Sequence, residues 1–188
     1  MNSLPVIVAV TGASGAPYAQ RLFRFLAQQG IPTHGVVSSA GRLVYRLETG
    51  RTLEEDLPAG IPLYAEDAFT APIASGSFRT RGMVIVPCTM GTLAAVANGL
   101  ANNLIHRAAD VCLKERRPLI VVPRETPLSA VHLKNMLALT EAGAVVLPPA
   151  PGFYHQPRTV DDLVDFVVGR ILDHLGIAHD LVVPWHGL

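Results

Sequence analysis

"PVIVAVTGASGAP" occupies residues 5–17 and passes from an apolar run into a turn with two glycines. The run 5–10 predicts a buried strand, because it is rich in β-branched residues and bounded by turn residues. Pro17 suits the first turn of a helix, where its missing N–H is not needed, so we expect a helix over 17–29. A strand, a tight turn and a helix in this order are typical of a parallel, doubly wound sheet.

The same alternation continues to the end of the chain. Further strands are expected at 33–38, 83–87, 118–122 and 144–148, and further helices at 40–48, 90–98, 103–116, 128–141 and 160–175. Strands that alternate with helices predict the α/β class with a single parallel sheet covered on both faces. No repeat or linker divides the sequence, so one domain over 1–188 is expected.

The composition narrows the class of partner. Fifteen basic and fifteen acidic residues give a net charge of zero, which argues against nucleic acid or an anionic membrane as a partner. Hydrophobic residues make up 49% of the chain, yet no apolar run approaches the roughly 20 residues of a membrane span. We therefore expect a homo-oligomer whose interfaces cover the excess apolar surface. With two cysteines and no signal-peptide pattern, a cytoplasmic location is expected.

Ligands of such sheets bind beyond the carboxyl ends of the strands, so the turns there are the candidate site. In the first turn, Gly12 and Gly15 allow close approach of the backbone and Ser14 adds a hydroxyl. The N-terminus of the following helix is expected to offer unpaired N–H groups to a phosphate. Ala16 stands where a nucleophile elbow would need glycine, which argues against a hydrolase.

Two further turns supply small and hydroxylic residues at the same edge. Ser38 ends the second expected strand, while Thr89 and Thr92 follow the third. Each is a candidate ligand contact, although a helix cap is the simpler role for any one of them. Cys88 is interpreted as a buried structural thiol rather than a nucleophile.

Charge concentrates in "LKERRPLIVVPRETP". Arg124 and Glu125 directly follow an expected strand, which puts a cation and a carboxylate at the ligand edge. Arg107 and Lys114 lie seven residues apart on the preceding helix, two turns along one face, where they could reinforce a single anion site.

Two other charged clusters have structural explanations. Arg116 and Arg117 lie at a helix C-terminus, where positive charge complements the helix dipole. "DDLVD", 161–165, resembles a metal-binding aspartate motif, but it opens an amphipathic helix after Thr159, an expected N-cap. Neither these aspartates nor the seven histidines show metal-site spacing, so no metal is indicated.

Several segments together resemble the UbiX-type flavin prenyltransferases, formerly described as aromatic-acid decarboxylases. The resemblance extends from about residue 5 to residue 185. It rests on "TGASGA", "LET", "ASGSF", "VIVPCTMGTLAAVANGLANNLIHRAADVCLKERRPLIVVPRETP" and "GFYHQP".

The resemblance implies a flavodoxin-like, Rossmann-type three-layer sandwich that is usually assembled as a dodecamer. It also implies transfer of a dimethylallyl group from dimethylallyl monophosphate to reduced FMN. The product, prenylated FMN, would be the cofactor of partner decarboxylases.

By the same resemblance, FMN would contact Gly12, Ala13, Ser14, Ser38, Thr89, Met90, Gly91, Thr92 and Arg124. The prenyl phosphate would lie among Lys114, Tyr154 and Arg170, and the reactive site would include Ser14, Glu48, Arg107 and Glu125. Relatives often carry tryptophan where this chain has Phe69, and its only tryptophan is Trp185. Both aromatic residues are candidate prenyl contacts, since aromatic faces stabilise cations.

These residue types suit the chemistry of dimethylallyl transfer. Breaking an allylic C–O bond leaves a phosphate and a delocalised cation, so fixed positive charge from Lys114 and Arg170 is expected at the phosphate, without metal. Flavin N5 would attack the allyl carbon, and ring closure at flavin C6 would release a proton. Glu48 and Glu125 are the candidates to handle that proton, with the departing phosphate as another acceptor.

Three alternatives remain at this point. An FMN-dependent decarboxylase of peptidyl or pantothenoyl cysteine would typically carry a catalytic His near the first helix and a "PxMNxxMW" motif, and neither occurs here. A module that stores or delivers FMN without chemistry would leave Glu48, Lys114 and Glu125 replaceable. Literal decarboxylation of an aromatic acid ranks last, because flavin alone offers no evident electron sink for it.

Overall fold

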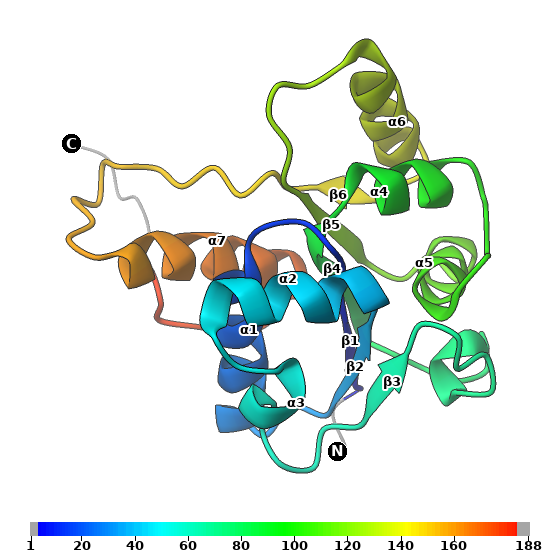
Figure 1. The fold of residues 1–188 in the computed structure, drawn as a ribbon, viewed down its shortest axis with the longest axis horizontal. Helices are drawn as coiled ribbons and strands as arrows, with labels where there is room; N and C mark the ends of the chain where they lie inside the picture. The colour runs from blue at the N-terminus through cyan, green and yellow to red at the C-terminus, as the bar shows by residue number, and fades with distance from the viewer. Residues whose placement is uncertain (1–3, 184–188) are drawn as a thin grey trace.

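A computed structural model describes residues 4–183 (Figure 1). Its elements are β1 (Val6–Val10), α1 (Ala16–Gln28), β2 (Thr33–Val37), α2 (Ser39–Thr49), α3 (Leu53–Asp56), β3 (Leu63–Ala65), the 3-10 helix η1 (Pro72–Ala74), β4 (Gly82–Cys88), α4 (Met90–Ala97), α5 (Leu104–Lys114), β5 (Leu119–Pro123), α6 (Ala130–Glu141), β6 (Val145–Val146) and α7 (Val160–His174). All five expected strands and six expected helices are present, with ends that differ by a few residues.

The strands form one parallel six-stranded sheet in the order β3-β2-β1-β4-β5-β6. Without the short edge strand β3, the order matches the 2-1-3-4-5 arrangement of flavodoxin-like folds. The chain reverses its direction of travel across the sheet between β1 and β4, and this switch point is where such folds bind ligands. The expected doubly wound, flavodoxin-like fold is confirmed.

Three short elements, β3, α3 and η1, were missing from the sequence-based prediction. Strand β3 has three residues, all only partly buried, so its hydrophobic pattern is too short and weak to stand out. Helix α3 has four residues and begins with a capping box between Thr52 and Glu55. This cap is the signal in the sequence that could have revealed α3.

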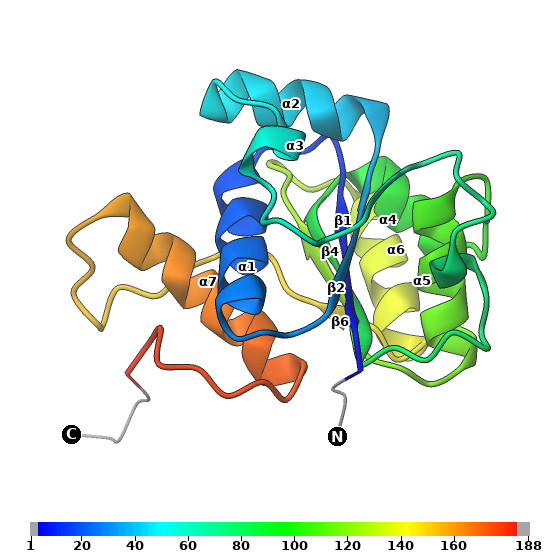
Figure 2. The same ribbon diagram turned by 90° about the horizontal axis from the view of Figure 1, so that it is seen from below.

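Alternating strand residues divide the core between the two faces of the sheet. Val6, Val8 and Val10 pack with α1 and α7, whereas Ile7 and Ala9 pack with α4 and α5. Figure 2 shows the resulting three layers, with α1 and α7 on one side of the sheet and α4, α5 and α6 on the other. The three-layer sandwich follows from burial of both strand faces.

Large apolar side chains remain exposed on α2 and α6. On α2, Leu43 and Leu47 are 62% and 75% exposed, and on α6, Val131 and Leu137 are 65% and 59% exposed. Apolar patches of this kind mark interaction surfaces. Among the described residues, no helix has the length and hydropathy needed to cross a bilayer.

Candidate active site

Thr11 joins the two strands that flank the switch point. Its hydroxyl donates to the Pro87 carbonyl at 2.8 Å and accepts from the Thr89 amide at 2.9 Å, and the residue is only 2% exposed. The turn after β1 and the turn after β4 are therefore fixed to one another. Thr11 was not singled out from the sequence, although a threonine immediately after a buried strand was a usable signal.

The side chain of Glu48, a residue of α2, caps the N-terminus of α1. Its carboxylate accepts the amides of Gly15, at 3.0 and 3.2 Å, and of Ala16, at 2.8 Å, although it comes from the last turn of α2. These N–H groups were expected to bind a ligand phosphate. That expectation was wrong, because a carboxylate of the protein already satisfies them and adds negative charge there.

The surroundings of Glu48 keep it ionised. Partial burial raises the pKa of this carboxyl, but polar contact with Ser14, the two loop amides and the nearby Arg124 cation outweigh burial and lower its pKa overall. Ser14, Glu48 and Arg124 thus form one group at the carboxyl edge of the sheet. A carboxylate in this state can accept a proton at neutral pH but holds none to donate.

The glycine loop has its conformation for two local reasons. A Cβ atom on Gly12 would lie 2.6 Å from the Cβ of Ala40, so Gly12 is required by the packing of α2 against the loop. Gly15 has φ of 128°, which side chains rarely tolerate. Close approach to a ligand is therefore not needed to explain either glycine.

The N-terminus of α4 is open, unlike that of α1. Thr89 caps the helix by accepting the Thr92 amide at 3.1 Å, and its hydroxyl donates to the Thr92 hydroxyl at 3.0 Å. The first-turn amides of Met90 and Gly91 have no acceptor within the helix. A Cβ placed on Gly91 would find no atom nearer than 4.0 Å, so this terminus faces open space. Its geometry suits a phosphate.

Two predicted contacts have local roles as well. Ser38 caps α2 by accepting the Gly41 amide at 2.9 Å. Glu125 is exposed, and its carboxylate accepts the amide of Thr126 at 3.0 Å. Glu125 lies next to Arg124 at the carboxyl edge, as expected, but within one protomer it is not a buried carboxyl.

Lys114 lies at the other edge of the sheet. Helix α5 begins beside Glu66, whose carbonyl accepts the Leu104 amide at 2.7 Å, and its eleven residues extend about 16 Å away from that edge. At its far end, the Lys114 ammonium pairs with Glu115 at 2.5 Å and faces Gly76. Arg107, on the same helix, donates to the Ala74 carbonyl at 3.0 Å and pairs with Asp110 at 2.9 Å.

Tyr154 and Arg170 meet on the opposite face of the sheet. They line a pocket of about 310 Å³ together with Phe166 and Asp173, and Arg170 pairs with Asp173 at 2.6 Å. Helix α7 covers one face of the sheet while α5 covers the other (Figure 2). Within one protomer, the sheet therefore separates Arg170 and Tyr154 from Lys114.

Phe69 and Trp185 are the two aromatic residues that were expected to contact the prenyl group. Phe69 is 48% exposed in the loop between β3 and η1, and Trp185 lies outside the described residues.

Cys88 is fully buried, and burial raises the pKa of its thiol, so its structural role is confirmed. Thr159 caps α7 in a capping box with Asp162, as expected for "DDLVD". Within residues 4–183, no three His, Cys, Asp or Glu side chains form a group that could hold a metal ion.

The chain resembles known flavoproteins over nearly its whole length. A family model described as Flavoprotein matches residues 1–172. The flavin prenyltransferase UbiX of Pseudomonas aeruginosa is 50% identical over 96% of this chain and 93% of its own length.

Two solved structures have the same fold at high identity. AnUbiX (PadA1), in complex with FMN and dimethylallyl pyrophosphate, is 41% identical with a TM-score of 0.95, covering 99% of both chains. A dodecameric FMN-dependent UbiX-like decarboxylase from Escherichia coli O157:H7 is 44% identical with a TM-score of 0.94, covering 98% of this chain and 100% of that one.

Proposed function

The chain belongs to the family of UbiX flavin prenyltransferases, and from this premise we propose that it transfers a dimethylallyl group from dimethylallyl monophosphate to N5 and C6 of reduced FMN. The product is prenylated FMN. The observation that carries the proposal is the pairing of an ionised Glu48 with an open helix N-terminus on the other side of the switch point. These provide a proton acceptor and a separate phosphate site at one edge of the sheet.

The described residues fit FMN. The open first turn of α4, with Met90, Gly91 and the Thr89 and Thr92 hydroxyls, would hold the FMN phosphate. Residues 12–14 and Ser38, at the ends of β1 and β2, would contact the rest of the molecule, and Arg124 would lie beside it. When bound in reduced form, the flavin supplies the nucleophilic N5 and C6 atoms.

The protein residues stabilise the charge on the departing phosphate and accept the proton released from C6. Cleavage of the allylic C–O bond sends its electron pair to the departing phosphate, which Lys114 and Arg170 stabilise as fixed cations. The proton on N5 would leave with the phosphate as the bond from N5 replaces the C–O bond. For ring closure, the allyl double bond would take up one proton, C6 would bond to the tertiary carbon, and the C6 proton would be released. Glu48, ionised beside Ser14, accepts that proton directly or through the hydroxyl, with Glu125 as the second carboxylate of the site. No step requires a metal.

The donor site is shared between copies of the chain. Lys114 and Arg170 lie on opposite faces of the sheet, so a phosphate that touches both must lie where different copies meet. The exposed apolar residues of α2 and α6 supply surface for such contacts, and the likeness to a dodecameric relative supports assembly as a dodecamer. The homo-oligomer is therefore part of the proposed mechanism.

The domain organisation, the recipient of the product and the location of the enzyme are proposed from the same family membership. The chain acts as one flavin-binding α/β domain, and a decarboxylase that depends on prenylated FMN receives the product. Two buried free thiols, Cys88 and Cys112, are compatible with the reducing conditions of the cytoplasm and support that location.

Release of phosphate tests the proposal. Anaerobic mixtures of the protein, dimethylallyl monophosphate and reduced FMN, with chelator present, are expected to release one phosphate for each flavin. Oxidised FMN in the same mixture should give none. No release of phosphate with reduced FMN refutes transfer from the monophosphate. If parallel mixtures with dimethylallyl diphosphate release pyrophosphate and the monophosphate does not react, the donor is the diphosphate.

Mixed oligomers test the shared site. Lys114→Ala and Arg170→Ala proteins are each expected to lose most turnover. Oligomers reassembled from both should regain part of it, because some sites then combine an intact Lys114 with an intact Arg170. No recovery in demonstrably mixed oligomers contradicts sharing between copies.

A further inference from the structure

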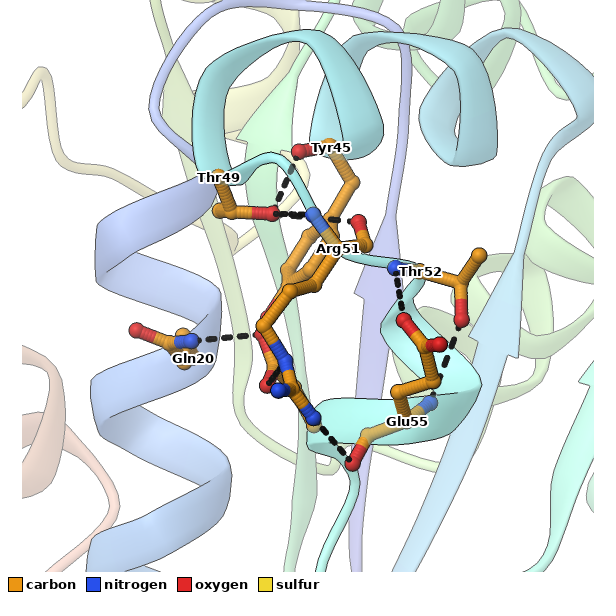
Figure 3. Close-up of polar contacts among 7 residues, drawn as sticks. Gln20, Tyr45, Thr49, Arg51, Thr52 and Glu55 are labelled. Carbon is orange, nitrogen blue, oxygen red and sulfur yellow. Dashed lines mark hydrogen bonds and ion pairs between the residues drawn. The ribbon is translucent and has the colours of Figure 1, made fainter.

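Asp56, in α3, is a buried carboxylate that no step of the proposed reaction uses. Its side chain is 5% exposed and receives three hydrogen bonds. Gln20 Nε2 and Tyr45 OH donate to Oδ2 at 2.7 and 2.9 Å, and Arg51 Nε donates to Oδ1 at 2.7 Å. Figure 3 shows Gln20 on α1, Tyr45 on α2 and Arg51 after α2 directed toward this region. Asp56 therefore joins three segments at one point.

The network lies one helical turn from the Glu48 contact. Gln20 is four residues after Ala16 on α1, and Tyr45 is three residues before Glu48 on α2, so each pair shares a helix face. The two helices are thus linked twice. Glu48 links them directly through the Ala16 amide, and Asp56 links them through Gln20 and Tyr45.

We propose that Asp56 is a positioning residue that fixes the rotation of α2 on α1 and thereby holds Glu48 on the glycine loop. The proposal deepens the function proposed above, because it assigns the residue that sets the position of its proton acceptor. A rotation of α2 by about 20° would move a side chain roughly 5 Å from the helix axis by about 2 Å. This displacement is enough to break the contacts between Glu48 and the loop amides.

The chemistry of the network favours a carboxylate at this position. Gln20, Tyr45 and Arg51 all present donors, and an aspartate is an acceptor at both oxygens. An asparagine side chain in its place would offer one acceptor oxygen and turn an NH₂ group toward a donor. The hydroxyl of Tyr45 stays a donor, because burial and the Asp56 carboxylate raise the pKa of this tyrosine.

The end of α2 is braced on its other side as well. Thr49 Oγ1 donates to the Tyr45 carbonyl at 2.8 Å, and the Arg51 amide donates to Thr49 Oγ1 at 3.2 Å (Figure 3). These contacts stay within the end of α2 and the turn after it, so they keep the local chain shape. The link to α1 comes instead from Asp56, through Gln20.

The test uses two variants and a matched control. Asp56→Asn removes one acceptor oxygen, and Tyr45→Phe removes a single hydroxyl while keeping the buried ring, which guards against loss of folding in the first variant. Glu54→Gln is the control, because Glu54 also joins α3 to α2, through Arg42 at 2.7 Å, but both side chains are exposed. FMN titration and thermal melting establish that each variant is folded.

Hydrogen exchange reports the position of Glu48 without any turnover. Amides of Gly15 and Ala16 are expected to exchange faster than in wild type in Asp56→Asn, Tyr45→Phe and the reference variant Glu48→Gln, and at the wild-type rate in Glu54→Gln. Wild-type exchange at these two amides in folded Asp56→Asn overturns the proposal. This readout stands even if the wild-type protein makes no prenylated flavin, an outcome that would count against the proposed function alone.

Turnover adds a second readout. Asp56→Asn should lower kcat by about 10- to 100-fold, the loss typical of a misplaced group, with FMN affinity nearly unchanged. In the Glu48→Gln background, Asp56→Asn should cost less than about a further twofold, because Asp56 acts through Glu48. Multiplicative losses in the double variant show an independent effect and overturn the proposal.

Discussion

Replacing Thr11 by valine tests the link across the switch point. Valine keeps the shape of the side chain and removes the hydroxyl that donates to Pro87 and accepts from Thr89. The Pro87 carbonyl stays satisfied, because the Thr11 amide also donates to it at 3.2 Å. The part-buried Thr89 amide loses its acceptor, and leaving a donor unpaired away from water costs about 1–3 kcal/mol. We expect Thr11→Val to lower the free energy of unfolding by about 2 kcal/mol.

Ligand binding should change selectively. Thr89 begins the turn that caps α4, so release of its amide is expected to disturb the proposed phosphate site. Loss of one hydrogen bond to a charged phosphate corresponds to roughly tenfold weaker binding. Titration with FMN and with riboflavin, which lacks the phosphate, separates this effect. FMN affinity should fall about tenfold and riboflavin affinity should change little.

Thr80→Val is the matched control. Thr80 is 5% exposed, and its hydroxyl has only the weakly bonding Cys112 thiol as a polar contact among the described residues. Urea denaturation should show no loss of stability in this variant, or a small gain. A Thr11→Val protein as stable as wild type, with unchanged FMN affinity, would refute the role assigned to Thr11.

Four further variants test individual residues. Glu125→Gln is expected to keep FMN but lose most turnover, and wild-type rates would exclude its role. Lys114→Ala should raise the KM for dimethylallyl monophosphate far more than the Kd for FMN, and equal losses of both would contradict separate sites. Because the folded pKa of Glu48 is lowered, its stabilising effect should be complete above about pH 4.3 and disappear as pH falls through the lowered value. The Tm difference between wild type and Glu48→Gln should therefore shrink on acidification, and a constant difference would contradict the assignment. Phe69→Trp should raise kcat, because indole is the stronger cation partner, and no change in stopped-flow rates would place Phe69 away from the prenyl group.

The fold followed from the sequence because buried parallel strands are continuous apolar runs. Each of the five runs became a strand, and the alternation with amphipathic helices gave the doubly wound arrangement. Strand β3 was not predicted, because three half-buried residues at a sheet edge carry almost no periodic signal.

The site was predictable only in part. Turns after strands could be placed at one edge, which correctly grouped Ser14 with Arg124. Glu48 was expected in the reactive site only by resemblance, and its contact with the α1 amides depends on how α2 packs, which no local pattern encodes. Helix spacing placed Arg107 and Lys114 on one face, but it could not show that Lys114 ends up at the far edge of the sheet.

The mass of the flavin after one turnover shows whether the dimethylallyl group has been transferred. Reduced FMN carrying deuterium at C6 would be incubated anaerobically with the protein and dimethylallyl monophosphate, then released and weighed by mass spectrometry. We expect a flavin that has gained one dimethylallyl unit and lost the C6 deuterium. Recovery of unmodified, deuterated FMN would contradict prenyl transfer, and a prenylated flavin that keeps its deuterium would contradict ring closure at C6.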